Sequence, residues 1–230
     1  MQPAGGRLRG ASVPRAAPCR AALLLWLAAG LFGSVACDER VRYSDSILLP
    51  VAVRGADASA ALRADVPEDL LAALGGEIPT RWPDTLPHWQ ADLDLEQWVV
   101  LRHEGLGEVG KDLAAAGRGE ATVRVREVRA SFDPGTLNLP VVQAEIFGAP
   151  EAGEAGPSAE AAARLARLAP LDRPTFDFVP GGRTQLEATL LAPASTLGVR
   201  TRLHFDTRTR PETPAGEGTL EIEIAVDVLF

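Results

Sequence analysis

The chain of 230 residues is poor in the residues that cross-link small domains or build metal sites. It contains only two cysteines, and its three histidines, His88, His103 and His204, show none of the spacings typical of metal ligands. The motifs G-x-S-x-G, C-x-x-C and the P-loop do not occur. These absences leave no signature for a disulfide framework, an activated nucleophile or a phosphate cradle. The domain must therefore be stabilised by its hydrophobic core.

A hydrophobic run long enough to span a bilayer is also lacking. Residues 21–36 are 16 uncharged residues, fewer than the ~20 that a transmembrane helix needs. Four arginines and no acid precede this run, and small residues end it. This order is typical of a secretory signal peptide. We predict that residues 1–36 are a cleaved signal peptide and that the chain is exported. Translation could start at Met1 or, from a non-AUG codon, at Val13, which would give a leader of ordinary length.

The residues at the end of this leader indicate a lipid anchor. Ser34, Val35, Ala36 and Cys37 form a sequence that resembles the lipobox of bacterial lipoproteins. The resemblance implies that Cys37 is diacylated, for example with palmitate, and becomes the first residue of the mature protein. The protein would then be tethered to a membrane on the periplasmic or outer-surface side of the cell envelope. The same small residues also suit ordinary signal peptidase, which would leave Cys37 as a free thiol.

Positive charge is scarce in the mature chain. Removal of residues 1–36 leaves 19 basic and 31 acidic residues, a net charge of −12. This excess repels nucleic acid phosphates and anionic lipid surfaces, so neither is an expected partner. The membrane enters as a partner only through the lipid on Cys37.

The pattern of the mature chain is mainly β. We predict a tether over residues 37–46 and a single β-rich domain over residues 47–230. Alternating apolar and polar residues predict strands. The positions of proline, glycine and leucine predict two short helices, and they also predict a coil that is held by Trp82 and Trp89. The predicted strands cover 47–53, 91–101, 122–132 with a β-bulge near Glu127, 141–147, 174–180 and 184–191, with helices over 66–76 and 159–169 and the coil over 78–89. These elements favour an antiparallel β-sandwich with short helical insertions.

The last two predicted strands have complementary outer faces. Arg200, Arg202, His204 and Arg208 alternate along residues 198–208, and Glu221, Glu223 and Asp227 alternate along residues 218–230. Opposite charges across neighbouring strands stabilise a pair by ~0.2–1 kcal/mol each. The pattern therefore predicts that the two segments form an antiparallel hairpin.

Two further patterns resemble ligand sites. Gly105, Gly107 and Gly110 match the dinucleotide motif G-x-G-x-x-G, but the surrounding antiparallel pattern lacks the required β-α-β context, which favours a plain glycine-rich loop. Asp92, Asp94 and Glu96 share one face of a predicted strand. A straight strand spaces such side chains about 6–7 Å apart, which suits a solvated face better than calcium coordination. The sequence predicts no metal, no cofactor and no catalytic set.

Three functional hypotheses remain from the sequence. The first is an envelope lipoprotein whose β domain acts by binding or as a structural part, without catalysis. The second is an envelope hydrolase, of carbohydrate type, that uses carboxylates the sequence does not identify. The third is a carrier of an apolar ligand, which would need a cavity of several hundred Å³ between the sheets.

Overall fold

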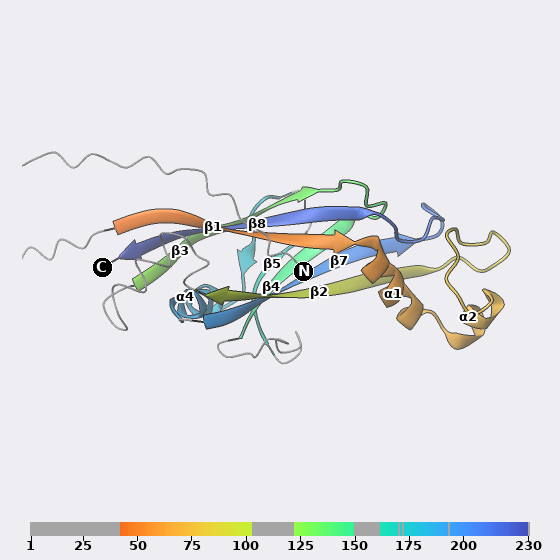
Figure 1. The fold of residues 1–230 in the computed structure, drawn as a ribbon, viewed down its shortest axis with the longest axis horizontal. Helices are drawn as coiled ribbons and strands as arrows, with labels where there is room; N and C mark the ends of the chain where they lie inside the picture. The colour runs from red at the N-terminus through yellow and green to blue at the C-terminus, as the bar shows by residue number, and fades with distance from the viewer. Residues whose placement is uncertain are drawn as a thin grey trace, which may run out of the picture.

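The computed structural model describes residues 42–102, 122–149, 162–169, 171, 173–192 and 194–229, and its fold is mainly β. Two antiparallel sheets pack face to face as a sandwich, with short helices toward its ends (Figure 1). This confirms the predicted fold class. The predicted signal peptide and Cys37 lie outside the described residues. No helix in the described ranges has the length and apolar character needed to cross a membrane.

The smaller sheet has β8 (Glu217–Leu229) at its centre, between β1 (Arg42–Arg54) and β3 (Thr122–Asp133). The inner face of β8 is at most 1 % exposed and consists of Leu220, Ile222, Ile224, Val226 and Val228. The alternation seen in the sequence therefore marks a true core face. β1 begins at Arg42, so the first strand extends into the range 37–46 that the sequence assigned to a tether.

The predicted bulge in β3 is present. The register of β3 against β8 shifts between Val125 and Glu127, where the phase of the apolar residues also reverses. The extra residue in one strand lets Val125 and Val128 both face the core. The backbone N–H of Val125, next to the bulge, donates to the Glu187 carboxylate at 2.9 Å.

The larger sheet has the order β2-β7-β4-β5-β6. Its strands are β2 (Gln90–Arg102), β7 (Ala194–Asp206), β4 (Val141–Ala149), β5 (Ala163–Leu168) and β6 (Asp177–Phe178). Its inner face packs against that of the smaller sheet in one continuous hydrophobic core.

The two sheets are joined along one edge by backbone hydrogen bonds. The N–H of Ala130 in β3 donates to Pro174 at 2.7 Å, and the N–H of Phe176 donates to Val128 at 2.9 Å. The chain then continues directly into β6 of the larger sheet. Along the opposite edge, the Gln97 amide of β2 donates to the Ala52 carbonyl of β1. Backbone hydrogen bonds therefore join the two sheets along one edge, and a side-chain hydrogen bond joins them along the other.

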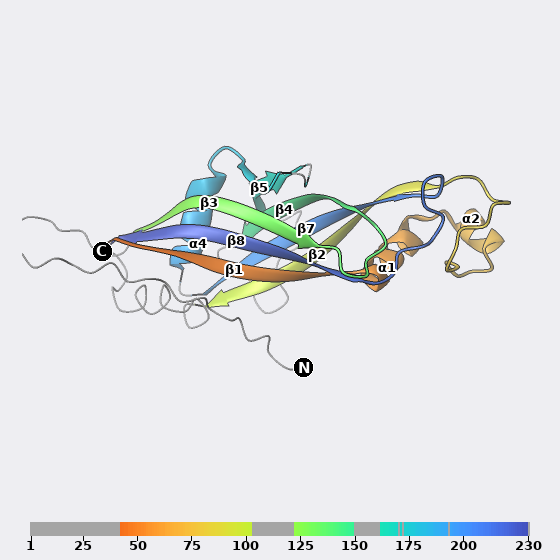
Figure 2. The same cartoon turned by 90° about the horizontal axis from the view of Figure 1, so that it is seen from above.

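Helices lie toward both ends of the sandwich. α1 (Gly55–Asp65) follows β1 at one end, with α2 (Glu68–Ala73) beyond it (Figures 1 and 2). α1 buries Ala58 and Leu62 against the core, and the sequence did not predict this helix. α4 (Gly182–Leu191) lies toward the other end and contacts strands of both sheets.

The proline-rich coil is ordered, as predicted, and Trp82 anchors it. This side chain is 2 % exposed, and its indole N–H donates to the Pro87 carbonyl at 3.0 Å. Its backbone N–H donates to Pro211 at 2.7 Å, and its ring meets the edge of Phe205 with centroids 6.2 Å apart. The coil is thus fixed to the end of β7.

The predicted hairpin of residues 198–208 with residues 218–230 is wrong. β7 pairs with β2 and β4 in the larger sheet, whereas β8 pairs with β1 and β3 in the smaller one. The arginines of β7 find their acids on β2 and β4 instead. Charge complementarity could not identify the partner, because several strands present acids at the same two-residue spacing.

Two other local predictions were also wrong. The segment 184–191, predicted as a strand, belongs to α4, whose buried residues Gly182, Leu186, Thr189 and Leu190 follow helical spacing. Residues 163–168, inside the predicted helix 159–169, form strand β5. This segment is rich in alanine and leucine and favours a helix locally. Pairing with both β4 and β6, and burial of Leu165 and Leu168, override that preference.

Candidate functional site

The outer face of the larger sheet carries a row of opposite charges across β2 and β7. The register places Asp92 opposite His204, Asp94 opposite Arg202 and Glu96 opposite Arg200. We refer to these three pairs as the charge ladder. The three acids are those that the sequence placed on one strand face. The structure shows that this face is occupied by cross-strand ion pairs.

The contacts within the charge ladder are short. Arg202 binds Asp94 through two parallel hydrogen bonds, from Nε at 2.6 Å and from Nη2 at 2.8 Å. Arg200 Nη2 lies 2.6 Å from Glu96 Oε1, and His204 Nδ1 lies 2.9 Å from Asp92 Oδ1. The hydrogen bond to Asp94 raises the pKa of Arg202 above its ordinary value. The paired geometry ties β2 to β7.

Glu145 on β4 extends the charge ladder and is its most buried member, with a side chain 5 % exposed. Arg164 Nη1 donates to it at 2.9 Å, and nitrogens of Arg200 and Arg167 lie 3.9 and 4.0 Å away. A register shift between β4 and β5 brings both Arg164 and Arg167 to this outer face. The guanidinium groups around Glu145 supply the partners that a buried carboxylate needs, so this cluster serves the fold.

The charge ladder ends against aromatic side chains. The guanidinium carbon of Arg200 lies 5.2 Å from the centroid of the Phe147 ring, within the range of a cation–π contact. On the neighbouring strand, the Trp98 ring covers Gly198, and an added Cβ there would lie 2.5 Å from it. Glycine at position 198 therefore makes room for the tryptophan ring.

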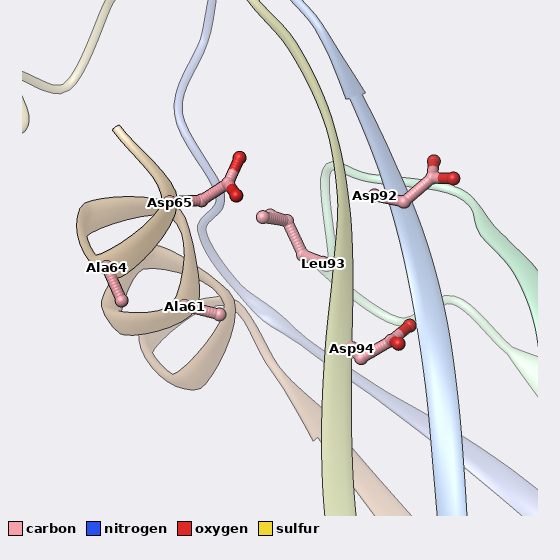
Figure 3. Close-up of a pocket in the computed structure, with 6 residues that line it drawn as sticks. All are labelled: Ala61, Ala64, Asp65, Asp92, Leu93 and Asp94. Carbon is pink, nitrogen blue, oxygen red and sulfur yellow. The ribbon is translucent and has the colours of Figure 1, made fainter. Parts of the chain in front are cut away.

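A shallow cavity of about 300 Å³ lies between α1 and β2, and Ala61, Ala64, Asp65, Asp92, Leu93 and Asp94 line it. Figure 3 shows the Asp65 carboxylate beside Leu93, while Asp92 and Asp94 extend to the other side of β2, toward β7. The latter two are held there by His204 and Arg202. The three carboxylates therefore do not converge, and the cavity provides neither a cation site nor a pair for acid–base catalysis.

A second hollow, of about 120 Å³, lies where β2 begins and β7 ends. His88, Trp89, Gln90, Asp206 and Arg208 line it, and we call it the tip pocket. The sequence pattern assigned Trp89 to the coil and Arg208 to a charged strand face, so it did not predict the pocket. Only the antiparallel pairing of β2 with β7 brings these two segments together.

Some of the positions singled out in the sequence lie outside the described residues. They are Cys37, His103, Gly105, Gly107 and Gly110. Within the described ranges, no group of three His, Cys, Asp or Glu side chains is arranged to hold a metal ion. Glu127 is hydrogen-bonded by Arg129 and Thr175, and the bond from Arg129 lowers its pKa. A general acid at neutral pH needs the opposite shift.

Comparisons with protein-family models, with curated proteins and with solved structures find no significant match to this chain.

Exchange of the charges of Asp94 and Arg202 tests whether the charge ladder stabilises the fold. Asp94→Arg alone places a cation beside Arg202 and should lower the free energy of unfolding by about 1 kcal/mol, since exposed pairs contribute 0.2–1 kcal/mol. Arg202→Asp alone should act similarly, and the double variant should recover most of the loss. Urea denaturation of the four proteins measures the coupling. Strictly additive losses would contradict a stabilising pair.

Proposed function

We propose that this protein is a bacterial envelope lipoprotein, anchored through lipid on Cys37, whose β domain acts by binding or as a structural part without catalysis. The observation that carries the anchor is the order of the N-terminal residues. A basic segment, a 16-residue uncharged run and the sequence Ser34-Val35-Ala36-Cys37 follow one another directly. Two or more acyl chains on one residue suffice for stable membrane attachment.

The start of β1 gives this anchor an orientation. β1 begins at Arg42, five residues after Cys37. Five residues span at most ~18 Å, so the end of the sandwich where β1 begins would lie close to the membrane. The 13 residues of β1 extend about 43 Å at ~3.3 Å per residue. The end that carries α1 and α2 would therefore point away from the bilayer (Figure 1).

Support for a non-catalytic domain comes from how the described acids are used. Asp92, Asp94 and Glu96 are paired with bases of β7, and Glu145 is surrounded by arginines. Glycoside hydrolysis needs two carboxyl groups that face one substrate, one of them with a raised pKa. These four acids are engaged with bases, which favours binding over the alternative of a carbohydrate hydrolase.

The alternative of an apolar-ligand carrier is less favoured, because side chains fill the space between the two sheets. Side chains from both sheets form one contiguous cluster between them, and its central members Leu93, Leu203, Phe205 and Ile222 are at most 2 % exposed. A carrier would require these side chains to separate by the width of its ligand.

Cys37→Ser tests the anchor. The wild-type protein, expressed in a bacterium fed radiolabelled palmitate, should carry the label and sediment with membranes even in high salt. Detergent should release it, because the attachment is apolar and a body of charge −12 is not attracted to anionic lipid. Cys37→Ser should lose the label and remain as the uncleaved precursor.

Cys19→Ser is the matched control, since Cys19 is the other cysteine of the chain and lies within the predicted leader. It should be labelled and anchored like the wild type. Normal cleavage of Cys37→Ser after Ala36, with both proteins soluble, would instead show an ordinary secreted protein.

A further inference from the structure

β1 forms one edge of the smaller sheet, with β8 between it and β3 (Figure 2). The opposite edge of this sheet is joined by backbone hydrogen bonds to the chain around Pro174. Residues 46–53 of β1 contain no charged side chain and five Ile, Leu or Val residues. Leu48, in the middle of this run, is 44 % exposed. An apolar edge strand of this length is a site at which a second copy could add its own strand.

Alternate residues of β1 direct their backbone groups toward this open edge. In an antiparallel pair, one residue directs both its N–H and its C=O to the partner strand, and the next residue directs both away from it. The Gly55 N–H donates to the Gly216 carbonyl at 2.8 Å, in the same register that pairs β1 with β8 without a break. The odd-numbered residues of β1 therefore bond to β8. The outward-facing positions are Ser44, Ser46, Leu48, Pro50, Ala52 and Arg54.

Three of these outward-facing positions lack a backbone group that a new ladder would need. The Ser46 N–H donates to the Asp45 carboxylate at 2.8 Å. Pro50 has no N–H. The Ala52 carbonyl accepts a hydrogen bond from the Gln97 side-chain amide of β2. We refer to Asp45, Pro50 and Gln97 as the edge guards.

The positions of the edge guards prevent a continuous ladder along β1. An added antiparallel strand would bond to both the N–H and the C=O at every outward-facing position, which recurs at every second residue. Ser44 and Leu48 are separated by the first blocked position, and Leu48 and Arg54 are separated by the other two. Hydrogen bonds at isolated positions do not offset the loss of freedom when two molecules associate.

We propose that the edge guards keep this protein from pairing with a second copy of itself through β1. Each guard removes or occupies one backbone group that the new ladder would use. The blocked groups belong to the β domain, so the inference goes beyond the proposed function and does not require that Cys37 is acylated.

Removal of the edge guards should open β1 to a second copy. The triple variant Asp45→Val, Pro50→Val and Gln97→Met frees the Ser46 N–H, restores an N–H at position 50 and frees the Ala52 carbonyl. The full-length protein, purified in detergent, is studied by sedimentation equilibrium in a solvent that matches the density of the detergent. The wild type should be monomeric at concentrations at which the triple variant dimerises. Each guard removed should tighten self-association by about tenfold, because each of the two copies gains one backbone hydrogen bond.

Hydrogen exchange at single residues shows whether β1 is the contact. The N–H groups of Ser44 and Leu48 face the open edge and should exchange rapidly in the wild type. In the dimer of the triple variant they should exchange at least about tenfold more slowly, because the second copy accepts them. The N–H groups of Ile47 and Leu49, which face β8, should exchange slowly in both proteins.

Asp45→Asn provides a matched control for Asp45→Val. The asparagine oxygen can still accept the Ser46 N–H. The triple variant with Asn at position 45 should therefore dimerise about tenfold more weakly than the one with Val. Equal dimerisation of the two would show that the bond to Ser46 does not guard the edge.

A second control adds apolar surface to the same sheet without opening an edge. Thr219→Val, Glu221→Val and Ala225→Val lie on the central strand β8 and remove one negative charge, as the triple variant of the edge guards does. This protein should stay monomeric. Association as strong as that of the triple variant would mean that exposed apolar surface, not an open edge, drives pairing, and would overturn the proposal.

Pro50→Val combined with Gln97→Met keeps the test decisive if the triple variant does not fold. Neither change removes a bond between β1 and β8, so this double variant should fold and should dimerise more weakly than the triple variant. A folded variant that stays monomeric, as judged with its circular dichroism spectrum, would overturn the proposal. A wild-type dimer with a slowly exchanging Leu48 N–H would overturn it as well.

Discussion

Val226→Asp is expected to unfold the domain at neutral pH or to lower its free energy of unfolding by more than about 3 kcal/mol. Val226 is 0 % exposed and lies on β8, between β1 and β3. Its register partners are Asp45 and Val125, and its side chain faces the hydrophobic core. A carboxylate there would have no base and no water, and domains of this size are stable by only ~5–15 kcal/mol.

The control for this prediction lies on the outer face of the same strand. Glu223→Lys should cost under about 1 kcal/mol, because the side chain is partly exposed and exposed charge pairs contribute little. Thermal denaturation by circular dichroism compares the two variants. Equal losses would mean that the assignment of inner and outer faces is wrong.

The pH dependence of Val226→Asp provides a second check. Burial raises the pKa of the introduced carboxyl above its unfolded value. Its penalty should therefore be largest well above that pKa and shrink as the pH falls and the group becomes neutral. The gap in stability between variant and wild type should narrow at acidic pH.

Gly216→Ala is expected to have the second largest effect on stability. It should lower the free energy of unfolding by about 3 kcal/mol or more. Gly216 has φ of +80°, where a side chain costs ~1–2 kcal/mol. An added Cβ would also lie 2.0 Å from the Thr136 carbonyl oxygen. This contact is part of a crossing of two loops, in which Thr136 N–H donates to Glu217 at 2.9 Å and Ala215 N–H donates to the Asn138 side chain at 2.8 Å. The loops must separate to admit the methyl group.

Gly181→Ala isolates the conformational part of that loss. Gly181 has a similar φ of +77°, but nothing lies within 4 Å of the position where its Cβ would be. Gly181→Ala should therefore lower the free energy of unfolding by only ~1–2 kcal/mol, which is what the left-handed conformation costs a residue with a side chain. Urea denaturation of both variants measures the difference, which corresponds to the steric clash at Gly216. Equal losses would show that the two loops can move apart freely.

Alternation of apolar and polar residues was a sound guide wherever one face of a strand meets the core. It located the buried face of β8 and, through a reversal of phase, the bulge at Glu127. It failed at residues 184–191, because Leu186 and Leu190 satisfy a period of two and a helical turn equally well. A strand and a helix would bury the same leucines, so the local pattern could not distinguish the two structures.

The candidate site was less predictable than the fold. The sequence placed Asp92, Asp94 and Glu96 on one face, but could not show that Arg200, Arg202 and His204 lie opposite them. The tip pocket had no sequence signal, because Trp89 and Arg208 are far apart in the chain and meet only through the pairing of β2 with β7. A site assembled from two strand ends has no local motif.

The sequence by itself determined the β class of the domain and the core faces of its long strands, because each depends on neighbouring residues. Only the tertiary structure decided which strands pair. Glu221 and Glu223 on β8 offered β7 the same charges at the same spacing as Asp94 and Glu96 on β2. The choice of strand partner depends on how the two sheets share one core. The stabilising energy comes from contacts between segments about 100 residues apart.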